Sequence, residues 1–378
     1  MFQPSLGAEE LAAVGEVFAS NWVGKGPRVA EFEARFAAHL GVGGGHLMSA
    51  DTCTEATFLA MRLAGVGPGD DVVLPTVCFV SAANAVAAHG ARPVFCDVDP
   101  RTLNPTAEHV EAALTPATKA VVVLHYGGHP GQVDRIAALC TERGLLLIED
   151  AANAPASAIG DRACGTFGDF GVWSFDHGKI AVSVDGGMLH ARDPEHIERG
   201  RKLAYLGLEQ TSGFAQAERA ATRWWDFEVS SFSRRSVMND VLAAIGCVQL
   251  GRLGEFLTRR AEVSAHYDRE FADLVDIPPP LPAGHRGSHY FYWVQLPPHL
   301  RDEVARDLYQ RGIYTTYRYP SLHRVAAFGS TAELPGADHA AERTLCLPMH
   351  QGLSDADVTA VVDGLKAALA ARTAGVAR

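Results

Sequence analysis

The sequence lacks the features that mark secreted, membrane-spanning and nucleic-acid-binding proteins. Its opening residues, MFQPSLGAEE, have neither the charged start nor the apolar core of a signal peptide. No uninterrupted apolar run reaches the roughly 18 residues that a membrane span needs. The 33 basic residues are outnumbered by 44 acidic ones, which gives a net charge of −11. We therefore expect neither a nucleic acid nor a membrane surface as its partner.

Cysteine is scarce, and its spacing shows none of the pairs that are typical of metal sites. The seven cysteines are Cys53, Cys78, Cys96, Cys140, Cys164, Cys247 and Cys346. Several lie inside apolar runs, which favours buried free thiols in a reducing cytoplasm over disulfides. We expect a cytoplasmic protein without a metal site.

The order of apolar segments predicts an α/β fold. Two amphipathic helices are expected at 7–20 and 28–40, and from Gly41 onward short apolar strands alternate with helical segments. The expected strands are 72–75, 92–97, 120–126, 145–150, 170–175 and 187–191, and the helices between them include 55–63, 81–89 and 133–143. Such alternation is typical of a mainly parallel sheet with helices on both faces.

A chain of 378 residues exceeds the size at which one hydrophobic core stops growing, so a second, smaller domain is expected. Helical periodicity runs from Val241 to about Ala272 and is followed by a proline-rich hinge at 278–282. A smaller α/β unit then has a strand at 290–295 and helices at 302–311 and 355–370. We expect a large domain over residues 1–250 and a smaller C-terminal domain over residues 251–378.

Polar residues of this chain cluster at the carboxyl ends of the expected strands, where ligands bind in open sheets of this kind. The loop 49–55 is small and polar and runs into the helix at 55–63. A helix N-terminus presents unpaired N–H groups and a partial positive charge, so it is able to hold a phosphate. Ser, Asp and Thr are also the residues of an ordinary helix cap, and on the residues alone that interpretation is the commoner one.

A second strand end carries the acidic pair Glu149 and Asp150, followed by small residues. A carboxylate there can keep the ring nitrogen of a pyridine protonated, so that the ring withdraws electrons when a C–H bond breaks. The alternative is that Asp150 caps a helix. Phe79 follows another strand end and offers a flat face for a ring, unless it belongs to the core.

Lys179 lies one short loop beyond the apolar strand 170–175, five residues after Ser174, whose hydroxyl is expected to point into the same crevice. We expect partial desolvation to lower the pKa of the Lys179 amine and make it a nucleophile near neutral pH. Read alone, Lys179 is more often one further surface lysine. The polar strand ends upstream favour the functional interpretation.

A phosphate cradle, an aromatic plate, a carboxylate and a lysine, in this order, are the parts that hold pyridoxal 5'-phosphate. With these parts the chain resembles the DegT/DnrJ/EryC1/StrS family of sugar aminotransferases, of fold type I, over nearly its whole length. The matching motifs are GPRVAEFE at 26–33, PGDDVVLP at 68–75, FVSAANAV at 79–86, HYGG around Tyr126, IEDAA at 148–152, SFxxxK ending at Lys179, VMNDVLAA at 237–244 and LCLP at 345–348. Each is weak alone, but eight in the family's order are specific.

The resemblance implies a role for each of the main candidates. Lys179 is expected to be joined covalently to the cofactor, and Asp150 to contact its pyridine nitrogen. Phe79 is expected to stack on the ring, and Asn153 to lie beside the ring hydroxyl.

For the phosphate, the resemblance implies Ser174 and the backbone N–H groups of Thr54 and Glu55. Glu55 stands where the family usually has a small residue, so its side chain must turn away from the phosphate or repel it. Arg235 occupies the position from which a neighbouring subunit normally sends an asparagine to the phosphate. An arginine there is able to bind the phosphate bidentately, or it is simply a solvated base beside Arg234.

Two further segments hold candidates for binding the substrate. The turn at 317–323 matches the family's turn near the sugar and the nucleotide, and it contributes Arg318, Tyr319 and His323. Arg318 suits a diphosphate, whereas His323 is equally explained by a structural role. In the linker 21–27, Trp22 and Lys25 either line a cleft or merely join two helices.

The resemblance implies a homodimer with shared active sites that moves an amino group from L-glutamate to the keto carbon of a nucleotide-linked sugar. The run EDAANAPAS with GTFGDFGVWSFD looks most similar to enzymes that aminate C4 of 4-keto-6-deoxy sugars, expected here as the dTDP-sugar in a deoxysugar or antibiotic pathway. Amination of C3 is the alternative. A sugar 3-dehydratase, which has histidine in place of Lys179, and a cofactor-sensing regulator are the other classes considered.

Overall fold

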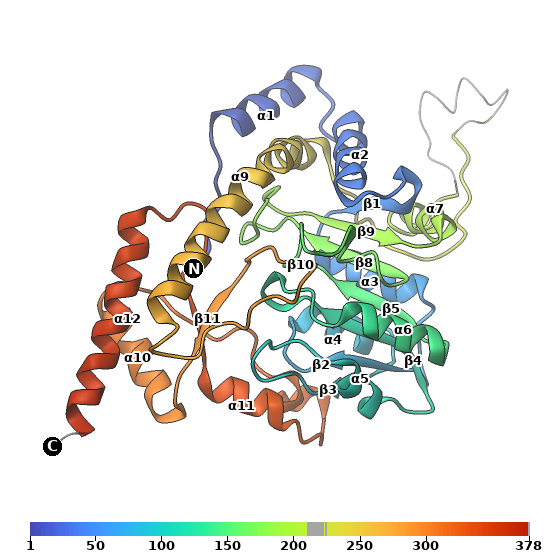
Figure 1. The fold of residues 1–378 in the computed structure, drawn as a ribbon. Helices are drawn as coiled ribbons and strands as arrows, with labels where there is room; N and C mark the ends of the chain where they lie inside the picture. The colour runs from blue at the N-terminus through green and yellow to red at the C-terminus, as the bar shows by residue number, and fades with distance from the viewer. Residues whose placement is uncertain (210–222, 224, 377–378) are drawn as a thin grey trace.

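The computed structural model describes residues 1–209, 223 and 225–376 and contains a seven-stranded central sheet (Figure 1). The strand order is β1-β9-β8-β5-β4-β2-β3. The strands are β1 (Leu47–Ala50), β2 (Asp71–Pro75), β3 (Arg92–Cys96), β4 (Thr118–Leu124), β5 (Leu146–Asp150), β8 (Phe170–Ser174) and β9 (Gly187–Ala191). Within this sheet β9 alone runs against its neighbours, so the predicted mainly parallel sheet is confirmed.

Helices cover both faces of this sheet because successive strand residues point in opposite directions. Val73, Val121 and Leu147 pack with α5 (Ala107–Ala113) and α6 (Val133–Arg143). The residues beside them, Val72, Val122 and Ile148, belong to the larger core that contains α3 (Cys53–Leu63) and α4 (Val80–Ala88). Strand pairing holds the carboxyl ends of β4, β5 and β8 side by side between these two cores.

The long helix α9 (Asp240–Phe271) crosses the molecule in Figure 1 and joins its two parts. Its first half packs on α1 (Ala8–Ser20) and α2 (Pro27–Leu40), and its second half on α12 (Asp355–Val376). By length and composition alone α9 could cross a membrane, with a mean hydropathy of 1.3 over its most apolar window. In the structure it packs as the core helix of a globular protein.

A second apolar core lies below α9 and belongs to the C-terminal part of the chain. It combines Val263, Tyr267 and Phe271 of α9 with β11 (Tyr292–Gln295) and β12 (Thr344–Leu347), which pair antiparallel. The helices α10 (Pro298–Gln310) and α12 complete it, and α11 (Pro335–Arg343) lies beside β11. The division of the chain at residue 250 stays a prediction; α9 runs without a break across that point.

Short elements complete the fold. They are α7 (Pro194–Leu203), the small strands β6 (Ala158–Ile159), β7 (Arg162–Ala163) and β10 (His285–Arg286), and the 3-10 turns η1 (Gly44–His46), η2 (Tyr126–Gly128), η3 (Leu322–Arg324) and η4 (Ala326–Phe328). All seven cysteines are free, and every one except the half-buried Cys53 is buried, which confirms the prediction of buried thiols.

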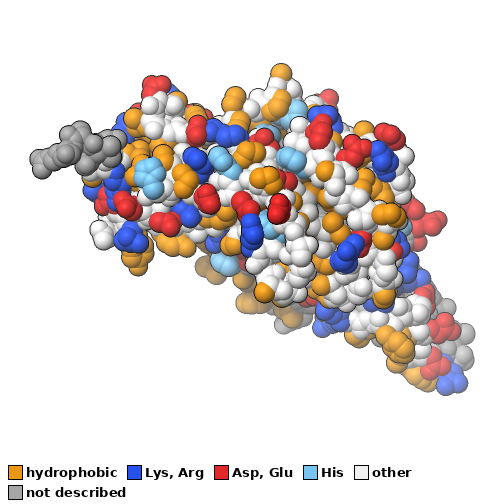
Figure 2. Space-filling model, turned by 90° about the horizontal axis from the view of Figure 1, so that it is seen from below, with side chains coloured by type: hydrophobic (Ala, Val, Ile, Leu, Met, Phe, Trp, Pro, Cys, Tyr) orange, Lys and Arg blue, Asp and Glu red, His pale blue; other side chains and the backbone are white. Residues whose placement is uncertain are grey.

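Charges of both signs are mixed on the surface of the protein. Figure 2 shows acidic and basic side chains alternating over the face seen from below. Many of the exposed charges are paired, as Arg135 is with Glu108 at 2.6 Å. Among the residues described on this face there is no broad basic region of the kind that holds the phosphates of a nucleic acid.

Candidate active site

A cavity of about 420 Å³ opens at the carboxyl edge of the central sheet, where β4, β5 and β8 end. Leu124 and Val172 flank Asp150 in the sheet, so these three strand ends lie side by side. Eight of the predicted site residues line the cavity: Thr54, Phe79, Asp150, Asn153, Ser174, Lys179, Arg318 and Tyr319. The structure therefore brings together residues from five regions of the chain in one place.

Lys179 lies in the turn after β8 and points its amine into this cavity. Its Nζ is 3.4 Å from Oδ1 of Asn153 and 4.9 Å from the centre of the Tyr290 ring. The turn is fixed because the backbone N–H of Lys179 donates to the carbonyl of Asp176. This hydrogen-bonded turn therefore positions the Lys179 amine in the lining of the cavity.

The predicted lowering of the Lys179 pKa is wrong. Burial does act to lower the pKa of this amine, but the acidic groups around it raise it by more, so the net pKa lies above its ordinary value. These groups are Tyr290, Tyr319, Cys53 and Asp150. The sequence suggested the burial of the amine but not the number of acidic groups that would surround it.

Asp150, at the end of β5, presents a buried carboxylate to the cavity and is 5% exposed. One of its oxygens accepts a hydrogen bond of 3.0 Å from the backbone N–H of Ala152. Burial raises the pKa of Asp150 above its usual value, and neither this hydrogen bond nor Lys179 fully offsets the effect. Such a carboxyl is suited to a cationic partner, for example a protonated ring nitrogen.

Asn153 has one buried polar atom without a hydrogen-bond partner among the described residues. Its Nδ2 is buried and has no hydrogen-bond acceptor within the described part of the chain, although its Oδ1 faces Lys179. A buried amide donor normally finds an acceptor. The position predicted beside the ring hydroxyl of the cofactor would supply one.

The N-terminus of α3 forms one end of the cavity. Thr52 caps the helix, since its hydroxyl accepts the backbone N–H of Glu55 at 2.9 Å. The backbone N–H groups of Cys53 and Thr54 have no acceptor among the described residues, so they are available to an anion. The loop fits closely around Gly187, where an added Cβ would lie 2.3 Å from the carbonyl oxygen of Thr52.

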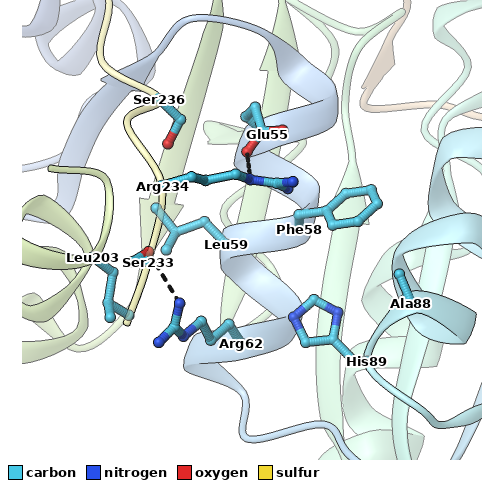
Figure 3. Close-up of a pocket in the computed structure, with 10 residues that line it drawn as sticks. All are labelled: Glu55, Phe58, Leu59, Arg62, Ala88, His89, Leu203, Ser233, Arg234 and Ser236. Atoms are coloured by element: carbon cyan, nitrogen blue, oxygen red, sulfur yellow. Dashed lines mark hydrogen bonds and ion pairs between the residues drawn. The ribbon is translucent and has the colours of Figure 1, made fainter. Parts of the chain in front are cut away.

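The side chain of Glu55 turns away from this cavity into a neighbouring one of about 360 Å³ (Figure 3). There its carboxylate pairs with Arg234 at 2.8 Å, and the guanidinium of Arg234 lies 5.1 Å from the Phe58 ring. Arg62 binds the same segment by donating to Ser233 at 3.0 Å. Of the two possibilities that the sequence left open, the side chain of Glu55 therefore turns away from the predicted phosphate site.

The remaining predicted residues lie outside the lining of the cavity. Arg235 is exposed, with its guanidinium 5.7 Å from the Tyr205 ring. Trp22 is 59% exposed and donates to the carbonyl of Lys25 at 3.0 Å. His323 is buried, and its Nδ1 lies 2.7 Å from the hydroxyl of Thr76.

Two aromatic residues in the lining were missed by the sequence analysis. Phe2 and Tyr290 stack with ring centres 5.5 Å apart and planes inclined by 13°. The hydroxyl of Tyr290 donates to the carbonyl of Gly178, one residue before Lys179, at 3.1 Å. No local pattern could have found them, because one lies at the start of the chain and the other in its C-terminal part.

Comparison with known proteins agrees with this geometry. The sequence model of the DegT/DnrJ/EryC1/StrS aminotransferase family matches residues 4–366. The chain belongs to this family. Members of it depend on pyridoxal 5'-phosphate and fold as type I transferases, so the predicted family, cofactor and fold class are confirmed.

Several relatives cover nearly the whole chain. It is 55% identical over 371 residues, 98% of the chain and 96% of the relative, to the dTDP-4-dehydro-2,3,6-trideoxy-D-glucose 4-aminotransferase of Saccharopolyspora spinosa. The crystal structure of the aminotransferase TlmJ from Streptoalloteichus hindustanus has 60% identity and a TM-score of 0.93, with 98% of both chains covered. That of the sugar aminotransferase CalS13 from Micromonospora echinospora has 27% identity and a TM-score of 0.87, covering 97% and 98%.

The residues of the cavity fit pyridoxal 5'-phosphate. Free N–H groups at the N-terminus of α3 suit its phosphate, the buried Asp150 suits its ring nitrogen, and the unpaired Asn153 donor suits its ring hydroxyl. Lys179 supplies the amine that the aldehyde requires. The enzyme is an aminotransferase.

Proposed function

We propose that this enzyme transfers an amino group from L-glutamate to C4 of a dTDP-4-keto-6-deoxy sugar, giving the 4-amino-4,6-dideoxy sugar. The observation that carries the proposal is a single cavity that joins the Lys179 amine to the Asp150 carboxylate. The 55% identical relative is named as a dTDP-sugar 4-aminotransferase, which supports C4 over C3 as the reacting carbon.

Pyridoxal 5'-phosphate, when bound, supplies an aldehyde that carries the amino group and a ring that withdraws electrons from the reacting carbon. With the cofactor bound, the buried carboxylate of Asp150 would stabilise a proton on the ring nitrogen. The Lys179 amine moves the proton to and from the substrate carbon. Glutamate and the keto sugar use these groups in turn, which gives ping-pong kinetics.

Arg318 is suited to the anionic part of the substrate. It lines the cavity, its guanidinium contacts the Phe2 ring, and it forms no ion pair with an acidic residue in the described part of the chain. Its backbone carbonyl accepts the hydroxyl of Tyr126, which holds this turn against the sheet. An unpaired guanidinium at this place would bind the diphosphate of the nucleotide bidentately.

A homodimer is part of the proposal, with Arg235 completing the phosphate site of the partner. Within one chain Arg235 is exposed and lies outside the cavity. Near it Phe227 and Phe232 are 62% and 96% exposed, although both are large apolar residues. The exposure of two large apolar side chains in the segment that leads to Arg235 supports an interface with a partner subunit. A cytoplasmic location is likewise proposed.

The visible absorption of the purified enzyme tests the first half of the reaction. Addition of L-glutamate should convert the spectrum of the bound aldehyde cofactor into that of its amine form. An unchanged spectrum would refute transamination from glutamate. The same measurement distinguishes an aminotransferase from a cofactor-binding regulator. For a regulator that only binds the cofactor, we expect no change of the spectrum on addition of L-glutamate.

A small panel of nucleotide sugars tests the second half. The amine-loaded enzyme is mixed with dTDP-linked 4-keto and 3-keto sugars, and mass spectrometry and NMR identify the products. We expect amination of the 4-keto sugars. Selective amination of the 3-keto sugars would agree with aminotransferase activity but contradict C4 as the reacting carbon.

A further inference from the structure

We propose that Gln351 and Arg260 are positioning residues that hold the turn carrying Lys179. Neither residue lines the cavity, so each acts on the reaction only through the residues that it binds. The inference rests on the proposed function, because that function gives the Lys179 amine the task of moving the proton. It extends the active site to the C-terminal part of the chain.

The backbone on both sides of Lys179 is held by side chains from that part. The carbonyl of Gly178 accepts the hydroxyl of Tyr290 at 3.1 Å, and the carbonyl of Ile180 accepts the side-chain N–H of Gln351 at 3.2 Å. Tyr290 lies just before β11, and Gln351 lies four residues after β12. The turn is therefore anchored immediately before and immediately after the lysine.

Arg260 of α9 connects the two anchors. Its Nε donates to Oε1 of Gln351 at 3.0 Å, and its Nη1 lies 3.1 Å from the carbonyl oxygen of His289 and 3.3 Å from that of Tyr290. A guanidinium has donors only. Gln351 therefore turns its oxygen toward Arg260, which leaves its NH₂ group to donate to Ile180.

The guanidinium of Arg260 is buried without a counter-ion. Arg260 is 1% exposed, and no acidic side chain pairs with it in the described part of the chain. Burial lowers its pKa to about 10, so it stays charged at neutral pH. Well-packed apolar residues often replace buried charges at lower cost in free energy. What the cation contributes here is the orientation of neutral acceptors, among them the Gln351 amide that leads to the Lys179 turn.

Loss of one anchor should slow the reaction while the cofactor still binds. The groups predicted to hold the cofactor belong to the central sheet and its helices, since Asp150 ends β5 and the free N–H groups begin α3. These groups have no bond to Gln351 or Arg260. A displacement of the amine by about 1 Å lowers a rate by up to about 100-fold.

Gln351→Glu separates positioning from stability. The new carboxylate should pair with Arg260, so we expect a Tm equal to or above that of the wild type. A carboxylate has no N–H to donate, so the carbonyl of Ile180 loses its partner. In a single-turnover reaction with L-glutamate, followed by the absorption of the cofactor, the maximal rate should fall roughly 10- to 100-fold. The L-glutamate concentration at half-maximal rate should change by less than about threefold, because Gln351 does not line the cavity.

A second readout does not depend on turnover. The backbone N–H groups of Gly178 and Lys179 both donate to Asp176. In Gln351→Glu, hydrogen–deuterium exchange of the full-length protein should be faster at these two N–H groups and unchanged in the strands of the central sheet. Arg260→Met, which removes the donors that orient Gln351, should show the same faster exchange and slower conversion. Gln351→Glu decides the test if Arg260→Met does not fold.

Arg259→Met is the matched control. Arg259 is the neighbour of Arg260 in α9 and also donates to a backbone carbonyl, that of Leu353 at 2.8 Å. Its other bonds go to Glu262 and Asp355, so none of them leads to the Lys179 turn. We expect wild-type rates and wild-type exchange at the turn.

A wild-type rate or unchanged exchange at the turn in Gln351→Glu would overturn the positioning role and leave the proposed function intact. An equal slowing in Arg259→Met would overturn it as well. If the wild-type enzyme does not convert its cofactor with L-glutamate, the proposed function fails and the inference fails with it.

Discussion

Glu149 and Asp150 are adjacent in β5 but point to opposite faces of the sheet. Glu149 is completely buried and accepts hydrogen bonds from His125 at 2.9 Å and from the backbone N–H groups of Gly165 and Gly168. Three hydrogen bonds inside the protein therefore engage both of its carboxylate oxygens. Asp150 has a single backbone donor and faces the cavity. The alternation of a strand thus separates a structural acid from one available to a ligand.

The carboxyl of Asp150 has a higher pKa in the folded chain than its ordinary value of 3.8. Its ionisation therefore destabilises the folded protein, and this penalty is absent below pH 3.8 and present once the pH exceeds the folded pKa. After removal of the cofactor, we expect Asp150→Asn to raise the Tm at pH 7.5 by roughly 1–3 °C. The difference should shrink as the pH falls toward 4, as measured by thermal unfolding.

The same substitution should reduce steady-state amination by roughly 100-fold, since a neutral amide does not hold a charge on the ring nitrogen. A gain in stability together with a loss of activity distinguishes this role from a purely structural one. A variant that is both less stable and fully active would contradict both expectations.

For Lys179→Ala we expect a folded protein without turnover. The side chain makes only a 3.4 Å contact to Asn153 and a ring contact to Tyr290, so its loss should change the free energy of unfolding by less than about 1 kcal/mol. Amination should fall below detection, because no other amine lines the cavity among the described residues. Borohydride reduction and peptide mapping of the wild type should place the cofactor on residue 179; an adduct elsewhere would end the assignment.

At the scale of elements, α9 caps another helix as well as crossing the molecule. α2 begins at Pro27 after Gly26, which has no side chain to cap it. Asp240, at the start of α9, accepts the backbone N–H groups of Gly26 at 2.8 Å and Val29 at 3.0 Å. One buried carboxylate therefore satisfies the N-terminus of α2 and ties it to α9.

Loss of this cap should be costly. We expect Asp240→Ala to lower the free energy of unfolding by about 2 kcal/mol and Asp240→Asn by roughly half of that, because an amide oxygen still accepts. Asp193, which caps α7 on the exposed surface, is the matched control and should cost only about 0.5–1 kcal/mol on change to Ala. Urea denaturation measures all three, and equal losses at the two sites would refute a special role for Asp240.

The helices and strands predicted correctly from the sequence were those in which apolar residues form a continuous run or recur at a regular spacing. The strands β2, β4, β5 and β8 and the helices α2, α6 and α9 were predicted to within a few residues, because each buries a continuous or periodic apolar face. The strand β1 has only four residues, and the helix α7 has only Ile197 and Leu203 as apolar side chains besides its proline, so neither was predicted.

The same division applies to the site. Lys179, Asp150 and Thr54 follow strand ends or begin a helix, and such positions can be recognised locally. Phe2 and Tyr290 reach the cavity only through tertiary packing, which no local pattern reports. The direction of the Lys179 pKa shift depends on the same long-range neighbours and was predicted wrongly for that reason.

For the whole molecule, the position of Arg235 raises the question whether each active site contains residues of one chain or of two. It lies outside the cavity of its own chain, whereas Lys179 and Arg318 both line it. If Arg235 serves the partner's site, a dimer of one Lys179→Ala chain and one Arg235→Ala chain contains one site with both native residues. Random mixing should then restore about a quarter of the wild-type activity, since half of the dimers are mixed and each has one intact site.

Each variant alone should be inactive or strongly impaired, and co-expression of differently tagged chains allows the mixed dimer to be isolated. The matched control mixes Lys179→Ala with Arg318→Ala. These two residues lie in the same cavity of one chain, so no mixed dimer has a native site and no activity should return. Recovery with Arg235→Ala but not with Arg318→Ala would place Arg235 in the site of the neighbouring subunit. Failure of both mixtures to recover would mean that each chain uses only its own residues.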